Sequence, residues 1–399
     1  MRTRSKIHLR PLTSVRFFAA FHVLVYHSSE WIDPIVPDGL GFLSHLLHTG
    51  YTGVNLFFVL SGFILAYTYL EPDQPARVDS RSFWWARFAR IYPLYIVSLL
   101  VIGPKVVGHF LDTNAWHTAL AKVVSSLAPA ATLTHAWIPP VRAIWNSPGW
   151  TLSAEAFFYL CFPWLAVLVW KLPPRRAVWL AGASWLAGLL PTLVSFSFLP
   201  EATLATPASE RMPESALSVL LRIAPIVRIP EFIFGMALAR AFFPRAAAED
   251  AALPVRFPTA LALGSFAGLV LAISFADHIP RVLVHAGVLN PFYGGLIVGL
   301  AHCRGWLERV MSIRLLVLFG EVSYAIYILH IPIRLWLADW IGEEATLRMG
   351  PLFFLLYASL VLAISTLAFY GIEDPARGWL RRRWSARRPR TVPGAEVAR

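Results

Sequence analysis

Long apolar stretches constrain the fold of this chain more than any other feature. A helix needs about 20 predominantly apolar residues to cross a bilayer. Stretches of that length cover 12–31, 50–70, 91–111, 150–170, 177–199, 217–243, 258–277, 282–303, 314–337 and 350–372. Only 15% of the residues are charged, whereas a soluble domain has about 25%. We therefore predict an all-α fold, a polytopic membrane bundle of about ten transmembrane helices.

The charge distribution predicts the topology. The net charge is +12, and arginine and lysine crowd the two ends of the chain and alternate loops, as in membrane proteins whose basic loops are cytoplasmic. We therefore expect both termini in the cytoplasm, contact with membrane lipid, and no nucleic acid partner. The first apolar stretch has no cleavage site of small residues and is read as a retained helix. Segment 115–138, interrupted by Pro129, is placed on the outer surface.

The chain is predicted to contain one membrane domain, 8–378, and a basic cytoplasmic tail, 379–399, disordered at its end. Two cysteines, Cys161 and Cys303, lie in apolar stretches. They form neither a disulfide framework nor a group with metal-ligand spacing. No metal is therefore predicted.

The first helix carries two polar residues that are unusual in a membrane. Arg16 and His27 are eleven residues apart, which is three helical turns plus about 20°, so both side chains lie on one face about 16 Å apart. A single arginine near a helix end more often reaches the interface, and a single histidine there more often only packs. Their shared face favours a functional role.

The second helix and the segment just before the third add polar groups. Asn55 is expected to line the outer half of the bundle, while Gly53 and Gly62 allow close helix packing. Arg87 and Arg90 are one turn apart, and paired guanidinium groups suit a polyphosphate. Setting the topology or holding anionic lipid is the alternative role for such arginines.

Two later helices carry further candidates. Glu155 lies inside an apolar stretch with Tyr159 one turn further on, and a buried glutamate either partners a cation or orients a base. Ser323, Tyr327 and His330 follow one helical stripe. Such a stripe more often joins helices by hydrogen bonds than performs chemistry.

These motifs occur in an order that resembles the membrane-bound acyltransferase-3 family, over residues 8 to about 378. They are Arg16 with His27; Gly50-x-x-Gly53-Val running to Phe57-Phe58-Val-Leu-Ser61-Gly62-Phe63; Arg90-Ile-x-Pro93-x-Tyr95; Trp150-x-Leu152-x-x-Glu155-x-x-Phe158-Tyr159; and Ser323-Tyr-x-x-Tyr327-x-x-His330. Many members have arginine before a proline where this chain has Asp374, which leaves the role of that position open.

The resemblance implies ten membrane helices and transfer of an acyl group, usually acetyl, from cytoplasmic acyl-CoA to a hydroxyl. Acceptors in the family are typically sugars of lipopolysaccharide, peptidoglycan, exopolysaccharide or Nod factors, and sometimes macrolides. The expected location is the bacterial inner membrane. The expected partners are acyl-CoA as co-substrate and a sugar-containing acceptor.

The residues and the resemblance together give one mechanistic hypothesis. His27 acts as a general base or takes the acyl group transiently, and Glu155 orients its imidazole. Arg16, Arg87 and Arg90 bind the acyl donor. The polar lining is completed by Asn55, Ser61, Tyr159, Ser323, Tyr327 and His330. Ser323, Tyr327 or Asn55 would stabilise the oxyanion.

Two other classes of protein fit the same polar residues. A proton-coupled transporter could use Arg16, His27 and Glu155 as a relay, although no repeated half is visible in the sequence. A non-catalytic assembly partner would use the polar stripes only to join helices.

Overall fold

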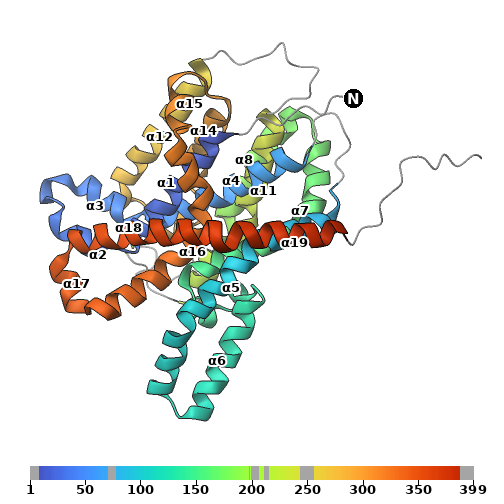
Figure 1. The fold of residues 1–399 in the computed structure, drawn as a ribbon. Coiled ribbons are helices and arrows are strands. Elements are labelled where there is room, and N and C mark those ends of the chain that lie inside the picture. The colour runs from blue at the N-terminus through green and yellow to red at the C-terminus, as the bar shows by residue number, and fades with distance from the viewer. Residues whose placement is uncertain are drawn as a thin grey trace, which may run out of the picture.

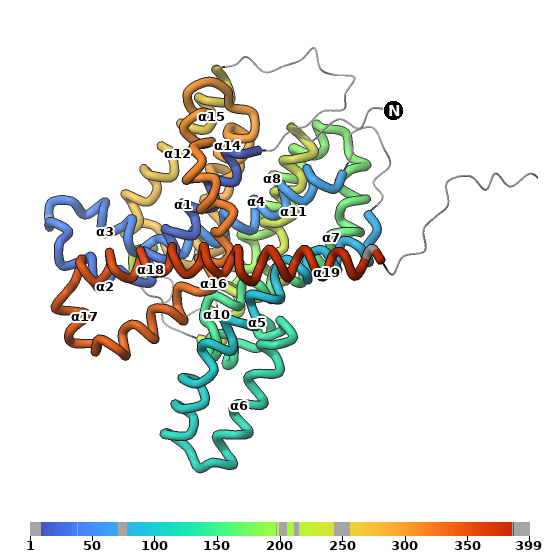
Figure 2. Tube along the Cα trace, viewed as in Figure 1, coloured from blue at the N-terminus to red at the C-terminus, as the bar shows by residue number. Residues whose placement is uncertain are grey.

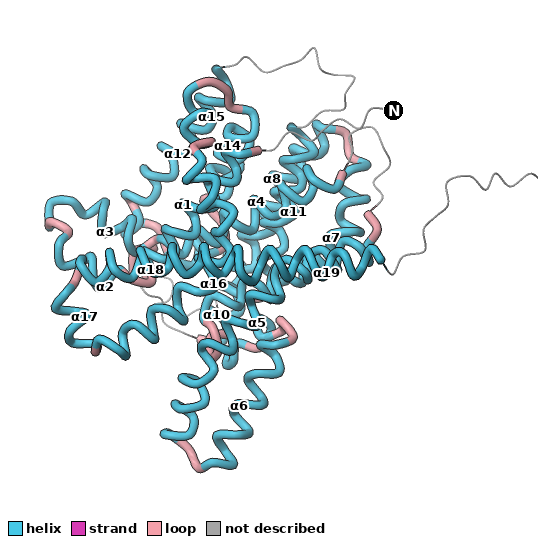
Figure 3. The backbone as a smooth tube through the Cα atoms, viewed as in Figure 1, coloured by secondary structure: helices cyan, strands magenta, loops and turns pink. Residues whose placement is uncertain are grey.

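The computed structural model describes residues 9–70, 78–196, 198, 206–210, 215–242 and 256–386. Within these ranges the chain forms helices joined by short loops, and Figure 3 contains no strand. The predicted all-α class is confirmed. The end of the predicted tail, 387–399, lies outside the described residues.

The helices differ widely in length. The longer ones are α1 (Arg10–Tyr26), α4 (Gly53–Tyr69), α5 (Ser80–Thr113), α6 (Trp116–Ala131), α7 (Trp150–Lys171), α8 (Pro174–Ser195), α11 (Pro225–Phe242), α12 (Arg256–Ser274), α14 (Asn290–His302), α16 (Arg314–Ile341), α18 (Pro351–Ala368) and α19 (Asp374–Ala386). The shorter ones are α2 (Ser29–Ile32), α3 (Gly41–His48), α10 (Ala216–Ile223), α13 (Arg281–His285), α15 (Trp306–Met311) and α17 (Glu343–Met349).

In the described part of the chain, 8 helices are long and apolar enough to cross a membrane. The sequence predicted about ten membrane helices. Two of those ten are not among the eight, because one is shorter and the other more charged than an ordinary membrane-spanning helix. The first, α1, has 17 residues, and α11 carries Arg228, Glu231 and Arg240. Both still lie inside the bundle, where α1 packs along α16, and α11 packs against α4 and α8 (Figure 1).

Segment 115–138 is less broken than the sequence predicts. Helix α6 continues through Pro129 and ends two residues later, at Ala131. It pairs with α5 in a hairpin that extends away from the other helices (Figure 2). At the base of the hairpin, the Tyr95 hydroxyl donates to the Ala130 carbonyl at 2.8 Å.

Glycines set the separation of the central helices. A Cβ atom at Gly62 on α4 would overlap the carbonyl oxygen of Phe232 on α11, and one at Gly235 on α11 would overlap the carbonyl oxygen of Val59 on α4. The two helices therefore touch backbone to backbone, as small residues permit in membranes. Gly320 on α16 lies in the same way against the carbonyl of Thr13 on α1.

A π-helical turn, Phe369–Glu373, joins α18 to α19, and the two form one long helix in Figure 1. Such turns change the direction of side chains and are frequent at functional sites. Here the turn carries Glu373 inward, so that its side chain is 2% exposed. Its neighbour Asp374 forms an ion pair with Arg377.

Candidate active site

A cavity inside the bundle is lined by three arginines, and we call it the arginine pocket. Arg16 reaches it from α1, and Arg87 and Arg90 reach it from the first part of α5. Its other polar lining residues are Ser61, Thr151, Glu155, Tyr159, Ser323, Tyr324 and Tyr327. Its volume is about 110 Å³. One water molecule takes up about 30 Å³, so the pocket has room for a small chemical group.

The position of Arg87 is fixed by aromatic side chains. Its Nη2 atom donates to the hydroxyl of Tyr69 at 3.2 Å. Its guanidinium carbon lies 5.6 Å from the ring centre of Tyr69 and 5.8 Å from that of Phe83, within the range of cation–π attraction. Arg90, three residues further on, lies on the same face of α5.

Two carboxylates partly neutralise this cluster. Glu155 lines the pocket and accepts a hydrogen bond from the Tyr159 hydroxyl at 3.1 Å. Glu155 and Glu373 both attract Arg16 electrostatically. Three guanidinium groups against two carboxylates leave a positive excess, which suits an anionic ligand.

A second cavity contains two histidines, His27 and His285, and we call it the histidine pocket. Its volume is about 170 Å³. Its cationic lining residues are Arg142, Arg222, Arg228 and Arg281, and its aromatic ones include Tyr26, Tyr51, Trp150 and Tyr327.

The two pockets lie end to end along the helices. On α1, Arg16 lines the arginine pocket and His27, just after the last residue of the helix, lines the histidine pocket. The eleven residues between them correspond to about 16 Å of helix. Val54 and Tyr327 line both pockets, so the two cavities are neighbours that share part of their lining.

The ring of His27 is held by a second histidine. Its Nδ1 atom lies 2.9 Å from the carbonyl of Val23 and 3.3 Å from Nε2 of His330. The other ring nitrogen of His330, Nδ1, lies 2.7 Å from the carbonyl of Tyr327.

These contacts define the tautomers, because a carbonyl can only accept. His330 must carry its proton on Nδ1, so its Nε2 accepts when the ring is neutral. His27 must then donate from Nδ1, shared between Val23 and His330. This arrangement leaves the lone pair of His27 on Nε2, where a general base needs it.

The structure gathers most of the predicted residues into the arginine pocket. Arg16, Ser61, Arg87, Arg90, Glu155, Tyr159, Ser323 and Tyr327 all line it. Asn55 and His27 line the histidine pocket instead, and Tyr327 borders both. His330 lies behind His27 as its hydrogen-bond partner.

Glu155 and His27, which were expected to lie together, line different pockets. Helix α7 starts at Trp150 in the histidine pocket and runs into the arginine pocket. Five residues advance it by about 7.5 Å, which carries Glu155 toward the arginines. Among the described contacts of His27, the side chain that can orient its ring is that of His330.

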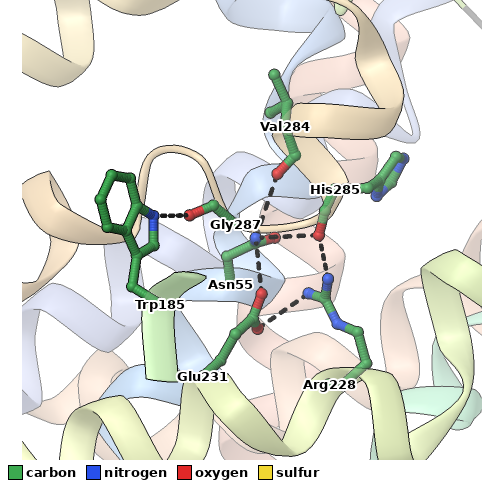
Figure 4. Close-up of polar contacts among 7 residues, drawn as sticks. All are labelled: Asn55, Trp185, Arg228, Glu231, Val284, His285 and Gly287. Atoms are coloured by element: carbon green, nitrogen blue, oxygen red, sulfur yellow. Dashed lines mark hydrogen bonds and ion pairs between the residues drawn. The ribbon is translucent and has the colours of Figure 1, made fainter. Parts of the chain in front are cut away.

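The sequence did not predict a buried polar network that forms part of the wall of the histidine pocket (Figure 4). Glu231 forms an ion pair with Arg228 at 3.1 Å, and its Oε1 accepts from the Asn55 side chain at 3.1 Å. Asn55 also donates to the carbonyls of Val284 and His285, at 3.3 and 3.4 Å. Arg228 donates to the same His285 carbonyl. The sequence did contain a signal for this network, because Arg228 and Glu231 are three residues apart in an apolar stretch.

Another histidine, His135, lies in the loop before α7, outside the membrane-spanning segments. Its side chain is 2% exposed, and burial lowers its pKa to about 4. The neighbouring Ala136 N–H donates to the Ser153 hydroxyl at 3.2 Å, tying this loop to α7. His135 is therefore a neutral packing residue in the loop that precedes α7, the helix that carries Glu155.

Across the ranges that the structure describes, no three His, Cys, Asp or Glu side chains form a group that could hold a metal ion.

Comparison with known proteins identifies the family. A family model described as an acyltransferase domain matches residues 12–370. Acyltransferase MdmB of Streptomyces mycarofaciens is 30% identical over 338 residues, which are 81% of this chain and 78% of that protein. No solved structure matches the chain.

Two longer relatives are more distant. "Putative peptidoglycan O-acetyltransferase YrhL" of Bacillus subtilis is 25% identical over 94% of this chain, and "Putative O-acetyltransferase SACOL0978" of Staphylococcus aureus is 21% identical over 92%. The match covers 56% and 57% of those two proteins. Because the family model matches nearly the whole chain, this multi-pass membrane protein belongs to the acyltransferase-3 family and is an acyltransferase.

Proposed function

We propose that this membrane acyltransferase moves an acyl group, normally acetyl, from acyl-CoA to a hydroxyl of a sugar-containing acceptor. We further propose that it works in the bacterial inner membrane with both termini in the cytoplasm. The names of YrhL and SACOL0978 as O-acetyltransferases support acetyl as the group and oxygen as its destination.

The arginine pocket is the proposed donor site. Coenzyme A is a polyanion, and Arg16, Arg87 and Arg90 supply guanidinium groups that match phosphate oxygens. The basic loops of the sequence support cytoplasmic exposure of the end of the bundle that carries Arg87 and Arg90. Acyl-CoA would then enter from the cytoplasm with its thioester directed toward Tyr327.

The histidine pocket is the proposed acceptor site, and the lone pair on Nε2 of His27 is the proposed base. The acceptor hydroxyl attacks the thioester carbon while His27 takes its proton. The carbon–sulfur bond of the tetrahedral intermediate then breaks, and the thiolate of coenzyme A receives the proton from the imidazolium. The products are the acyl ester and free coenzyme A.

Tyr327 is the proposed donor to the oxyanion, because its side chain borders both pockets. A hydroxyl aimed at the thioester oxygen would stabilise the charge that develops there. His330 is the proposed positioning residue, which fixes the tautomer of His27 and stabilises the imidazolium in place of Glu155.

One observation carries the proposal: an oriented imidazole, His27, lines a pocket whose walls Val54 and Tyr327 are shared with a pocket of three arginines. This arrangement lets two substrates approach from opposite ends and meet at one base.

The test uses the purified full-length protein, acetyl-CoA labelled in the acetyl group, and envelope glycans extracted from the native host. Label should pass to alkali-labile esters of the glycan, and free thiol should appear in equal amount. Acetyl-CoA binding without ester formation, for every glycan fraction, would contradict the proposal. Transport of a solute into vesicles containing the protein, without release of free thiol, would favour the alternative of a proton-coupled transporter.

A further inference from the structure

A buried carboxylate, that of Glu373, lies behind the arginine pocket. We propose that its ionised form is a counter-ion to Arg16 and Arg90 that weakens the binding of the coenzyme A phosphates. Free coenzyme A can then leave after the acyl group has been transferred. This inference rests on the proposed function, because it takes the arginine pocket as the donor site.

The backbone carries Glu373 into the bundle at the junction of α18 and α19. The π-helical turn Phe369–Glu373 contacts α5, the helix that supplies Arg90 to the pocket. Glu373 is 2% exposed, whereas the next residue, Asp374, is exposed. Among the residues that the structure describes, the buried Oε2 atom of Glu373 has no hydrogen-bond partner. Such an atom is costly to bury, so packing alone does not explain this carboxylate.

The charges that act on Glu373 belong to the pocket. Arg90 attracts its carboxylate most strongly and Arg16 comes next. Tyr324, which lines the pocket, also interacts electrostatically with Glu373. The Tyr324 hydroxyl donates to the carbonyl of Ile91, the residue after Arg90, at 2.7 Å. Glu373 therefore acts on a ligand through the arginines, which makes it a positioning residue of the donor site.

The phosphate contacts of the donor create a need for such a counter-ion. Acetyl-CoA and free coenzyme A carry the same phosphates, so contacts to these groups hold the product as tightly as the substrate. Uniform binding of this kind lowers KM without raising kcat, and product release limits turnover in many enzymes. An anion beside the donor arginines repels the phosphates and so favours release of coenzyme A.

The experiment measures equilibrium binding of coenzyme A and acetyl-CoA to the purified full-length protein in uncharged detergent. Glu373→Gln removes the charge and keeps the size of the side chain. Its Kd for both molecules should fall about tenfold, as expected when one like charge is removed from an anion site. KM for acetyl-CoA should fall with it, whereas kcat should not rise. Glu373→Met, uncharged and of similar size, should give the same gain in affinity.

Two control variants isolate the charge at this position. Glu373→Asp keeps a carboxylate and should bind coenzyme A with nearly the wild-type Kd. Asp374→Asn removes the neighbouring acid, which is exposed and forms an ion pair with Arg377. Because water screens exposed charges, this variant should leave donor binding unchanged.

A donor without phosphates separates charge from shape. S-Acetylpantetheine has the thioester arm of acetyl-CoA and is uncharged. Glu373→Gln should leave KM for this donor unchanged, because a counter-ion acts only on a charged ligand. A purely structural role would alter the use of both donors.

Three outcomes would overturn the inference. The first is unchanged or weaker binding of coenzyme A by Glu373→Gln and Glu373→Met, which would leave Glu373 with a structural role. The second is an equal gain in affinity in Asp374→Asn, which would make the effect one of net charge only. The third is an equal change of KM for acetyl-CoA and S-acetylpantetheine, which would place the effect at the thioester and not at the phosphates.

Failure of this inference can be told apart from failure of the proposed function. Arg16→Ala should weaken binding of coenzyme A if the arginine pocket is the donor site. Weaker binding by Arg16→Ala without tighter binding by Glu373→Gln would reject the counter-ion and keep the donor site. Unchanged binding by both variants would reject the donor site and the counter-ion together.

Discussion

The Nε2 atom of His330 lies 3.3 Å from the Nδ1 atom of His27, although the two residues are 303 positions apart in the chain. The carbonyl of Tyr327 fixes the donor side of His330, and this in turn fixes which nitrogen of His27 is basic. The hydroxyl of Tyr357 donates to the His330 carbonyl at 2.9 Å and holds the backbone of this residue. In the proposed mechanism this pair takes the place of a histidine–carboxylate pair, without a formal negative charge.

Replacing His27 by alanine should remove acyl transfer. General base catalysis contributes about 100- to 10,000-fold, so kcat of His27→Ala should fall by at least about 100-fold while acetyl-CoA still binds. The measurements are ester formation with labelled donor and equilibrium binding of acetyl-CoA. Activity close to wild type would exclude this imidazole from the reaction.

Replacing His330 should act through His27. We expect His330→Ala to lower kcat about 10- to 100-fold, the usual effect of removing a partner that orients a reactive histidine, with little change in KM for the donor. His330→Gln should recover part of the loss, because its amide oxygen can accept from Nδ1 of His27. Equal loss in both variants, or a change confined to KM, would contradict the positioning role.

Replacing Arg16 should affect the donor. Loss of one charge-assisted hydrogen bond weakens binding about tenfold or more, so Arg16→Ala should raise KM for acetyl-CoA by that factor. The matched control is Arg314→Ala, which removes an exposed arginine at the start of α16. An unchanged KM would leave Arg16 with a role in topology only.

Adding a methyl group between α4 and α11 should destabilise the bundle. Gly62→Ala and Gly235→Ala each place Cβ against a backbone carbonyl of the other helix, and overpacking of this kind costs about 1–3 kcal/mol. The thermal midpoint in detergent should fall for both. Gly264→Ala on α12 is the control, because its Cβ would meet no atom within 4 Å. Equal midpoints for all three variants would show that the close crossing is not required.

Acidification should destabilise the loop that contains His135. Its pKa is lowered to about 4, whereas an unperturbed histidine has about 6.5. The neutral ring therefore stabilises the fold fully above pH 6.5, and this contribution, on the order of 3 kcal/mol, is lost as the pH falls from 6.5 toward 4.

The check is the thermal midpoint of wild type and His135→Gln across this pH range. The difference between the two proteins should change steadily with acidification, because glutamine does not titrate. A constant difference would mean that His135 is not buried in its neutral form.

Much of the arginine pocket could be predicted from the sequence. Arg16 and Glu155 stand out in apolar stretches, and their cost in a membrane indicates an interior position. Helical periodicity also correctly placed Ser323 and Tyr327 on one side of their helix, facing the same cavity. Local spacing was sufficient because each of these residues is inward-facing on its own helix.

The histidine pocket could not be predicted in the same way. The contact between His27 and His330 depends on how α1 packs along α16, and no local pattern encodes that register. Arg228 and Glu231 form an ion pair within one helix. In a sequence, such a pair indicates a structural role and not a lining residue of a pocket. Arg142 and Arg281 lie in segments between long helices, where arginine is common and position is set by the tertiary fold.

The close glycine contacts have a consequence for substrate entry. Since α4 is locked to α11 at Gly62 and Gly235, and α1 to α16 at Gly320, neither couple can separate without breaking these close backbone contacts. Both couples contribute walls to the two cavities. On the proposed function, we expect the portals for coenzyme A and for the acceptor to open along the seams between the locked couples. Crosslinks across those seams should then block turnover, whereas crosslinks within a couple should not.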